Sequence, residues 1–178
     1  MKIVVIGGSP RRAGNTPIMM RYVYDYARQK DHEVVFVDLA EGEVECFRGF
    51  EEPYNETTKK AAADITDADV WLIGTPVYNS LFSGALKNLF EYVNYKETAG
   101  KTAGIAILGA GQISFTDVQT ILTQLMSYFG VITNPKAVFM TTDEIKDGQV
   151  AGDDAKARLR EMVDGTLDLA SKLRQGRR

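Results

Sequence analysis

The stretch MKIVVIGGSPRRAGNT, residues 1–16, joins a short apolar run to a loop of glycine, arginine and small polar residues. The run is nearly continuous in β-branched side chains, which is typical of a parallel strand covered on both faces. The loop cannot be core: Ser9, Asn15 and Thr16 can donate hydrogen bonds, and Arg11 can add a charge-assisted one. A helix that starts after such a loop directs its positive end at the same place. The stretch therefore predicts a strand, an anion-binding loop and a helix.

The rest of the chain repeats this alternation of strand and helix. Further apolar runs, predicted as buried strands, span 33–38, 69–75, 102–108 and 136–141. Helical patterns cover about 16–30, with Thr16 as cap and Pro17 in the first position, then 57–66, a segment from Ser83, 114–129 and 153–173. We therefore predict a single α/β domain over residues 1–178, a doubly wound, five-stranded parallel sheet in the flavodoxin-like order 2-1-3-4-5 with helices on both faces. The acidic, aromatic connection 40–56 is the long irregular one, a candidate lid or oligomer contact.

Composition narrows the class of protein. The 178 residues carry a net charge of −3, so bulk attraction to nucleic acid or to an anionic membrane is not indicated. No apolar run is long enough for a membrane helix, and the first segment lacks the features of a signal peptide. One cysteine, Cys46, excludes an internal disulfide framework and a cysteine-cluster metal site, which favours the cytoplasm. The one histidine, His32, precedes the second strand, and we expect it to be a surface residue.

Three loops follow strands that are neighbours in this order: 8–16, 76–84 and 109–114. Ligands of open parallel sheets bind outside the carboxyl ends of the strands, so these loops should converge on one crevice. The first loop is neither a dinucleotide fingerprint nor a Walker A motif, because the required glycines and lysine are absent. The second, with Pro76 and Asn79, offers an extended backbone edge for a flat heterocycle.

Together the loops resemble those of the NADPH-dependent FMN reductase family. GSPRRAGNT (8–16) is similar to the family's phosphate loop, and PVYNSLFSGALKN (76–88) to its second flavin loop, with an ending typical of the azobenzene reductase and quinone reductase subgroup. Three residues depart from the family pattern: Gly14 stands where Ser is common, Ser80 where Gly is usual, and Ser83 where Pro is usual.

The resemblance implies a set of cofactor-binding residues. The FMN phosphate would be bound by Ser9, Arg11, Asn15 and Thr16; the ribityl chain and isoalloxazine would lie against Pro76, Val77, Tyr78, Asn79 and Ser80; the pyrimidine end of the ring would contact Gly109, Ala110, Gly111 and Gln112. No side chain is expected to act as a catalytic or metal-binding group, because the cofactor carries the chemistry.

The implied activity is that of an FMN-dependent oxidoreductase. It would pass electrons from NADPH or NADH through FMN to a small acceptor such as free flavin, a quinone or an azo compound, and would work as a homodimer or homotetramer. The alternative is a flavodoxin-type electron carrier that binds FMN without oxidising a nicotinamide nucleotide. Arg11 and the modest net charge argue against the carrier, and a flavin-dependent sensor stays open.

Overall fold

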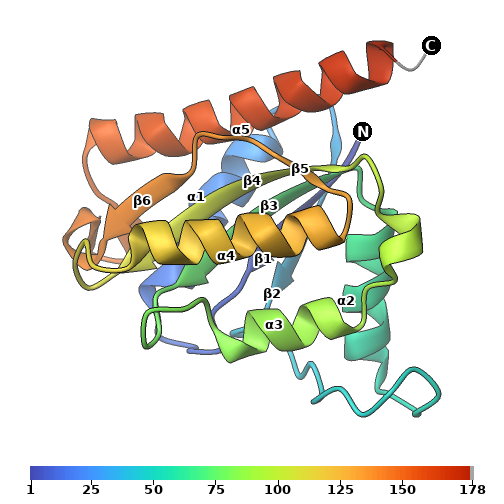
Figure 1. Cartoon of the computed structure of the whole chain (residues 1–178). Coiled ribbons are helices and arrows are strands. Elements are labelled where there is room, and N and C mark those ends of the chain that lie inside the picture. The colour runs from blue at the N-terminus through green and yellow to red at the C-terminus, as the bar shows by residue number, and fades with distance from the viewer. Residues whose placement is uncertain (177–178) are drawn as a thin grey trace.

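A computed structural model describes residues 1–176 as a parallel sheet with helices on both faces (Figure 1). The sheet order is β2-β1-β3-β4-β5, with β6 also paired to β4. The strands are β1 (Lys2–Gly7), β2 (Glu33–Asp38), β3 (Val70–Pro76), β4 (Thr102–Gly109), β5 (Ile132–Thr133) and β6 (Val138–Thr141). The helices are α1 (Asn15–Ala27), α2 (Glu56–Asp67), α3 (Gly84–Glu91), α4 (Phe115–Tyr128) and α5 (Asp153–Gln175). The predicted doubly wound fold and strand order are confirmed.

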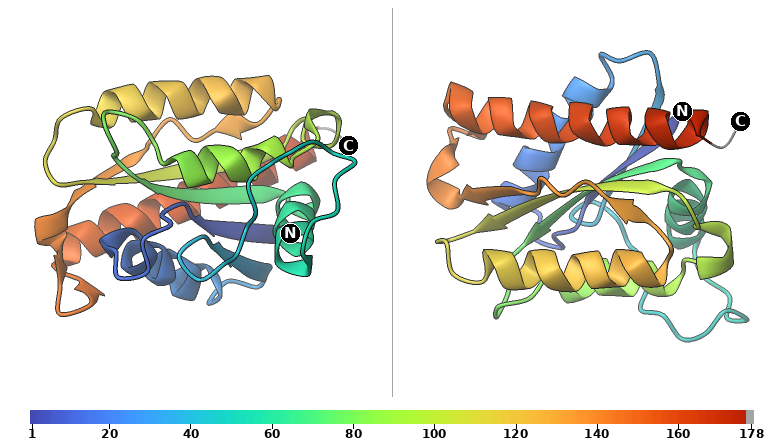
Figure 2. Two further views of the ribbon diagram at one scale, coloured as in Figure 1. Left: turned by 90° about the horizontal axis from the view of Figure 1, so that it is seen from below. Right: turned by 45° about the horizontal axis from the view of Figure 1, so that its top comes forward.

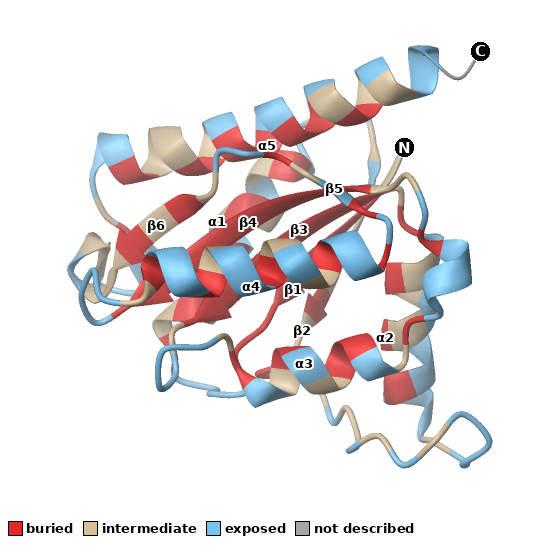
Figure 3. Ribbon diagram, viewed as in Figure 1, coloured by how far each residue is buried: buried red, intermediate tan, exposed pale blue. Residues whose placement is uncertain are grey.

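Two hydrophobic layers sandwich the sheet. Helices α1 and α5 pack on one face, while α2, α3 and α4 pack on the other, as the two views of Figure 2 show. The central strands are buried along their whole length, and the helices bury only their inner sides (Figure 3). Trp71 in β3 is fully buried, and its indole Nε1 donates to the carbonyl of Ile65 at 2.9 Å. Within the described residues 1–176, no helix is long and apolar enough to cross a lipid bilayer.

The structure corrects several boundaries. Helix α1 begins at Asn15 with Gly14 as its N-cap, so Thr16 does not cap it; the Thr16 side chain is buried inside the first turn. The strand expected over 136–141 begins only at Val138, because it is one half of an interrupted edge.

That interrupted edge lies beside β4. Strand β5 pairs with the start of β4 and β6 with its end, and the two are separated by Asn134, Pro135 and their neighbours. Pro135 cannot donate to a strand ladder. The Asn134 side chain turns inward instead, donating to Met162 O at 3.3 Å and to Thr166 Oγ1 at 3.1 Å in α5. The sequence pattern also did not indicate the hairpin of β7 (Ile145–Lys146) and β8 (Gln149–Val150).

The ends of β1 and β3 meet through two glycines. The amide of Gly8 donates to the carbonyl of Gly74 at 2.8 Å. A Cβ on Gly8 would lie 2.5 Å from that carbonyl oxygen, and a Cβ on Gly74 would lie 2.2 Å from the side chain of Met20 in α1. Side chains at these positions would push apart the two strand ends and the helix above them.

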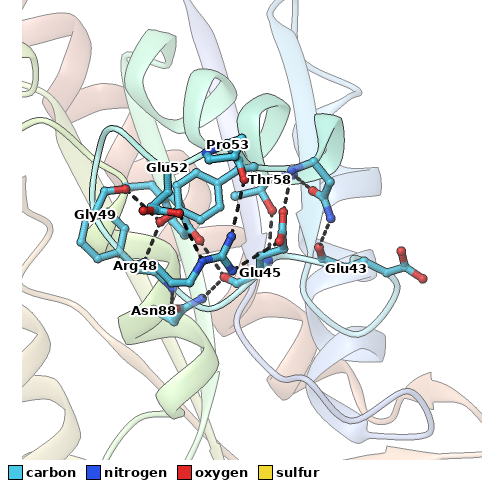
Figure 4. Close-up of polar contacts among 12 residues, drawn as sticks. Glu43, Glu45, Arg48, Gly49, Glu52, Pro53, Thr58 and Asn88 are labelled. Atoms are coloured by element: carbon cyan, nitrogen blue, oxygen red, sulfur yellow. Dashed lines mark hydrogen bonds and ion pairs between the residues drawn. The ribbon is translucent and has the colours of Figure 1, made fainter.

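The 40–56 connection is held against α3 by side chains of that helix and of its C-cap residue, Tyr92 (Figure 4). Asn88 accepts from the amide of Phe47 at 2.9 Å and donates to the carbonyl of Glu45 at 2.8 Å. The Tyr92 hydroxyl donates to the same carbonyl at 2.7 Å, and its ring packs edge-on against Phe47 and Tyr54. This connection is therefore fastened to the second half of α3, away from the loops that follow β1, β3 and β4.

Replacing Gly8 by Ala should lower the free energy of unfolding by about 1–3 kcal/mol, because the methyl group would overlap the Gly74 carbonyl. Urea denaturation without ligand measures this. The matched control is Gly84→Ala at the start of α3, where an added Cβ meets nothing within 4 Å; its stability should stay the same or rise. Equal midpoints for Gly8→Ala and the wild type would contradict the close contact.

Tyr92 should make the protein sensitive to alkali. Burial, together with neighbouring Tyr54 and Glu45, raises the pKa of Tyr92 to about 12 from an ordinary value of 10.0. The folded state therefore holds this proton more tightly than the unfolded state, so stability falls as pH rises from about 10 to about 12. Tyr92→Phe should lose about 0.5–1.5 kcal/mol at neutral pH with its hydrogen bond, and should show a shallower alkaline loss.

Urea titrations of both proteins at pH 7 to 12 measure this difference. Tyr128→Phe, at an exposed position on α4, is the control and should follow the wild-type profile. Parallel pH profiles for Tyr92→Phe and wild type would show that Tyr92 does not hold its proton more tightly when folded.

Candidate functional site

The loops after β1, β3 and β4 lie at the same end of the sheet, at the left of Figure 1 and of the left panel of Figure 2. They enclose a pocket of about 240 Å³. The pocket is lined by Ser9, Arg11, Ala13, Gly14, Asn15, Thr16, Pro76, Val77, Tyr78, Leu108, Gly109, Ala110 and Thr142. We refer to it as the three-loop pocket, and to the loops in chain order as loop one (8–16), loop two (76–84) and loop three (109–114).

Loop one brings hydrogen-bond donors to the pocket beside the start of a helix. The Gly14 amide donates to Arg11 O at 3.1 Å, which turns the chain tightly into α1. Ser9 is 1% exposed, and its hydroxyl accepts from the amide of Arg11 at 3.3 Å. The first turn of α1 contains no acidic residue. Among the described residues that line the pocket, none carries a carboxylate, so its charge favours an anion.

A larger hollow of about 440 Å³ beside α1 carries charged side chains of both signs. It is lined in part by Asp25, Asp38 and Glu41, and also by the basic side chains of Arg21 and Lys156. Burial raises the pKa of Asp38, since the charged carboxylate loses hydration there. Acidic side chains outnumber basic ones by three to two in this lining, whereas the described lining of the three-loop pocket has Arg11 and no carboxylate. The three-loop pocket is therefore the better anion site although it is smaller.

Loop two begins with a tight two-residue turn. The amides and carbonyls of Tyr78 and Leu81 exchange hydrogen bonds at 2.8 and 3.0 Å, and Asn79 and Ser80 between them have φ values of 49° and 67°. These left-handed values at two successive residues are those of the turn that favours Asn-Gly. The Val77 amide, just before this turn, donates to Leu108 O at 2.9 Å. The extended backbone edge expected to include Asn79 is therefore wrong beyond Tyr78, because Asn79 and Ser80 form a tight turn and the amides of Val77 and Tyr78 are already paired within the protein.

Ser83 links loop two to loop one. Its hydroxyl accepts from the amide of Leu86 at 3.0 Å, which confirms the predicted cap of α3. The same hydroxyl donates to the carbonyl of Gly8. A proline at this position could make neither bond, so this departure from the family pattern fastens the two loops together. The Tyr78 hydroxyl adds a second link, at 3.4 Å from Ser9 Oγ.

The thirteen residues predicted to bind the cofactor divide into two groups. Those that line the three-loop pocket are Ser9, Arg11, Asn15, Thr16, Pro76, Val77, Tyr78, Gly109 and Ala110. Those outside its lining are Asn79, Ser80, Gly111 and Gln112. Gln112 instead lines an adjacent hollow of about 560 Å³ together with Phe115, Phe139 and Arg158.

Four lining residues were not predicted: Ala13, Gly14, Leu108 and Thr142. Thr142 belongs to a short turn, η2 (Thr142–Glu144), directly after β6. The rule that ligands gather at carboxyl ends of strands would have found it, had it been applied to the last strand as well. Glu144 fixes this turn, because its carboxylate accepts from the Thr141 amide at 2.9 Å and pairs with Arg158 of α5.

Comparisons with known proteins agree with this geometry. A family model described as NADPH-dependent FMN reductase matches residues 1–144. The NADPH azoreductase of Bacillus sp. (strain OY1-2) is 32% identical over 92% of this chain and 89% of its own length. The FMN-dependent NADPH-azoreductase of Staphylococcus saprophyticus is 24% identical over 92% of each chain.

The fold has a similar outline in a solved structure, the apo form of an NADH:FMN oxidoreductase. It superimposes with a TM-score of 0.78 at 20% identity, covering 94% of this chain and 89% of that one. The family match extends over all three loops of the pocket and over every strand of the sheet. The chain therefore belongs to the NADPH-dependent FMN reductase family.

Proposed function

We propose that the three-loop pocket binds FMN, and that the protein uses it to pass electrons from NADPH or NADH to a small acceptor such as free flavin, a quinone or an azo compound. The observation that carries the proposal is the convergence of three loops on one pocket rich in donors and free of carboxylates among the described lining residues. When bound, FMN would supply the redox chemistry, and the protein would supply position and electrostatics.

The phosphate end of FMN fits loop one. Ser9, Asn15 and Thr16 offer side-chain donors, and Arg11 offers a charge-assisted bond that suits phosphate geometry. The positive end of α1 adds a partial charge of the right sign at the same place. The residues present therefore match the needs of a phosphate group.

The flat part of FMN fits the wall formed by loops two and three. Pro76, Val77 and Tyr78 line the pocket together with Gly109 and Ala110, which carry no large side chains. Small residues at this position let the backbone approach a planar ligand closely. We include Asn79, Ser80, Gly111 and Gln112 in the proposed site as rim residues that lie next to the lining in sequence.

Family membership favours a reductase over the flavodoxin-type carrier. We further propose that the protein acts in the cytoplasm as a homodimer or homotetramer. Exposed apolar side chains on and beside α4, among them Ile113, Ile121 and Tyr128, offer a surface for contact between copies. Sedimentation velocity over a range of protein concentrations tests the assembly.

Arg11→Ala should weaken FMN binding about 10- to 150-fold, because a lost charge-assisted hydrogen bond costs about 1.5–3 kcal/mol. Calorimetric titration of the apoprotein with FMN measures the change. Arg12→Ala is the matched control: it removes the same charge one residue away, from a side chain outside the lining of the pocket. Equal FMN affinities for the two variants would remove Arg11 from the site.

Steady-state kinetics should follow a ping-pong pattern. The three loops form one pocket, so we expect the nucleotide and a planar acceptor to reach the bound FMN through the same opening. They would then have to use it in turn, and the oxidised nucleotide would leave before the acceptor enters. Double-reciprocal plots at several fixed acceptor concentrations should then be parallel. Intersecting lines with several different acceptors would require both substrates to bind together.

The choice between reductase and carrier has a direct readout. Anaerobic addition of NADPH or NADH to the FMN-loaded protein should bleach the flavin absorbance. His32→Ala should bleach at a near-normal rate, since this side chain precedes β2, at the amino ends of the parallel strands, whereas the three loops follow their carboxyl ends. An absorbance that stays unchanged with both nucleotides would favour the carrier.

A further inference from the structure

Two serines connect the loops on either side of the pocket. Ser80 of loop two and Ser114 of loop three lie 34 positions apart in the chain, yet their hydroxyl oxygens are 2.8 Å apart and hydrogen-bonded. Each belongs to a loop that lines the three-loop pocket, through Tyr78 and Ala110 respectively. Their bond therefore spans the rim of the pocket between loops two and three.

Both serines have backbone conformations that serine rarely adopts. Ser80 has a φ of 67° and Ser114 a φ of 66°, in the left-handed region where a side chain is strained. Another two-residue turn of the chain avoids this strain at its second position. The β7–β8 hairpin uses the same kind of two-residue turn, and there the second position is Gly148, with a φ of 72°. Glycine at position 80 would serve the turn better, but it has no hydroxyl.

Ser114 does not make the helix-capping hydrogen bond that is usual for a serine at its position. It is the N-cap residue of α4, but its side chain makes no cap hydrogen bond. A serine at this position normally accepts from an amide in the first turn of the helix and so stabilises it. Here the hydroxyl is directed at Ser80 instead. Loop two therefore has a serine where glycine would suit the turn better, and loop three lacks the capping hydrogen bond that Ser114 could make. In their place the two serines bond to each other.

We propose that Ser80 and Ser114 form a clasp that holds loops two and three together at the rim and slows the exchange of FMN. This rests on the proposed FMN site. The two serines are positioning residues: they touch each other rather than line the pocket. Their clasp lengthens the residence time of bound FMN.

The test separates the clasp from backbone strain. Ser80→Ala removes the hydroxyl and keeps the strain, whereas Ser80→Gly removes both. Each of these, and Ser114→Ala, should speed FMN dissociation about 2- to 10-fold, the effect of one neutral hydrogen bond. The double variant Ser80→Ala/Ser114→Ala should be no faster than the single ones, because all three break the same bond. Stopped-flow flavin fluorescence after dilution measures these rates.

The variants at position 80 should differ in stability although they release FMN at similar rates. Thermal unfolding of the apoprotein should show Ser80→Gly more stable than Ser80→Ala, although both release FMN faster. Asp147→Gly, which relieves the left-handed residue at the other two-residue turn, is the matched control: it should raise stability and leave FMN release unchanged.

Two results would overturn the clasp. One is that Ser80→Gly releases FMN at the wild-type rate; the other is that the effects of the two alanine substitutions multiply in the double variant, as they would for independent positions. Arg11→Ala, measured in parallel, separates this failure from that of the site. If Arg11→Ala weakens FMN binding and the serine variants do not, the clasp alone is wrong. If none of them has an effect, the FMN site itself is wrong.

Discussion

The contact between Gly8 and Gly74 is the constraint on which the rest of the site depends. The amide of Gly8 reaches the carbonyl of Gly74 across the ends of β1 and β3, and a Cβ on Gly8 would prevent this approach, while a Cβ on Gly74 would collide with Met20 of α1. Loop one thus leaves the sheet directly beside loop two. The hydroxyl of Ser83 then bonds to Gly8, so the start of α3 is held to the same point. The pocket owes its shape to this joint as much as to the residues that line it.

Most of the fold could be predicted because its strands are read almost directly from the sequence. A strand covered on both faces must be apolar along its whole length, and β1, β3 and β4 are fully or almost fully buried. The predicted helix boundaries were less accurate where the backbone conformation of a single residue decides where the helix begins. The start of α1 is an example: Gly14 supplies the cap position, and the Thr16 side chain is used for packing.

The residues of the pocket were predicted in outline, but the hydrogen bond between two loops at its rim was not. Residues such as Ser9, Arg11 and Tyr78 belong to motifs whose spacing gives their place, and they line the pocket. The pairing of Ser80 with Ser114 could not be read in this way, because it joins two loops whose separation depends on the packing of α3 and α4. The same is true of Asn88, whose amide group holds the 40–56 connection through contacts more than 40 positions away.

The interruption between β5 and β6 also affects how the protein meets its surroundings. An edge strand with a continuous row of free amides and carbonyls is a template on which another chain can add a strand, and this is a route to aggregation. Beside β4 that row is cut into two short pieces by Pro135, and the Asn134 side chain bonds inward to α5. A continuous sheet across two molecules is therefore disfavoured at this edge. The proposed contact between copies would then have to use the helical surfaces rather than this edge, and contacts between side chains there can be selective.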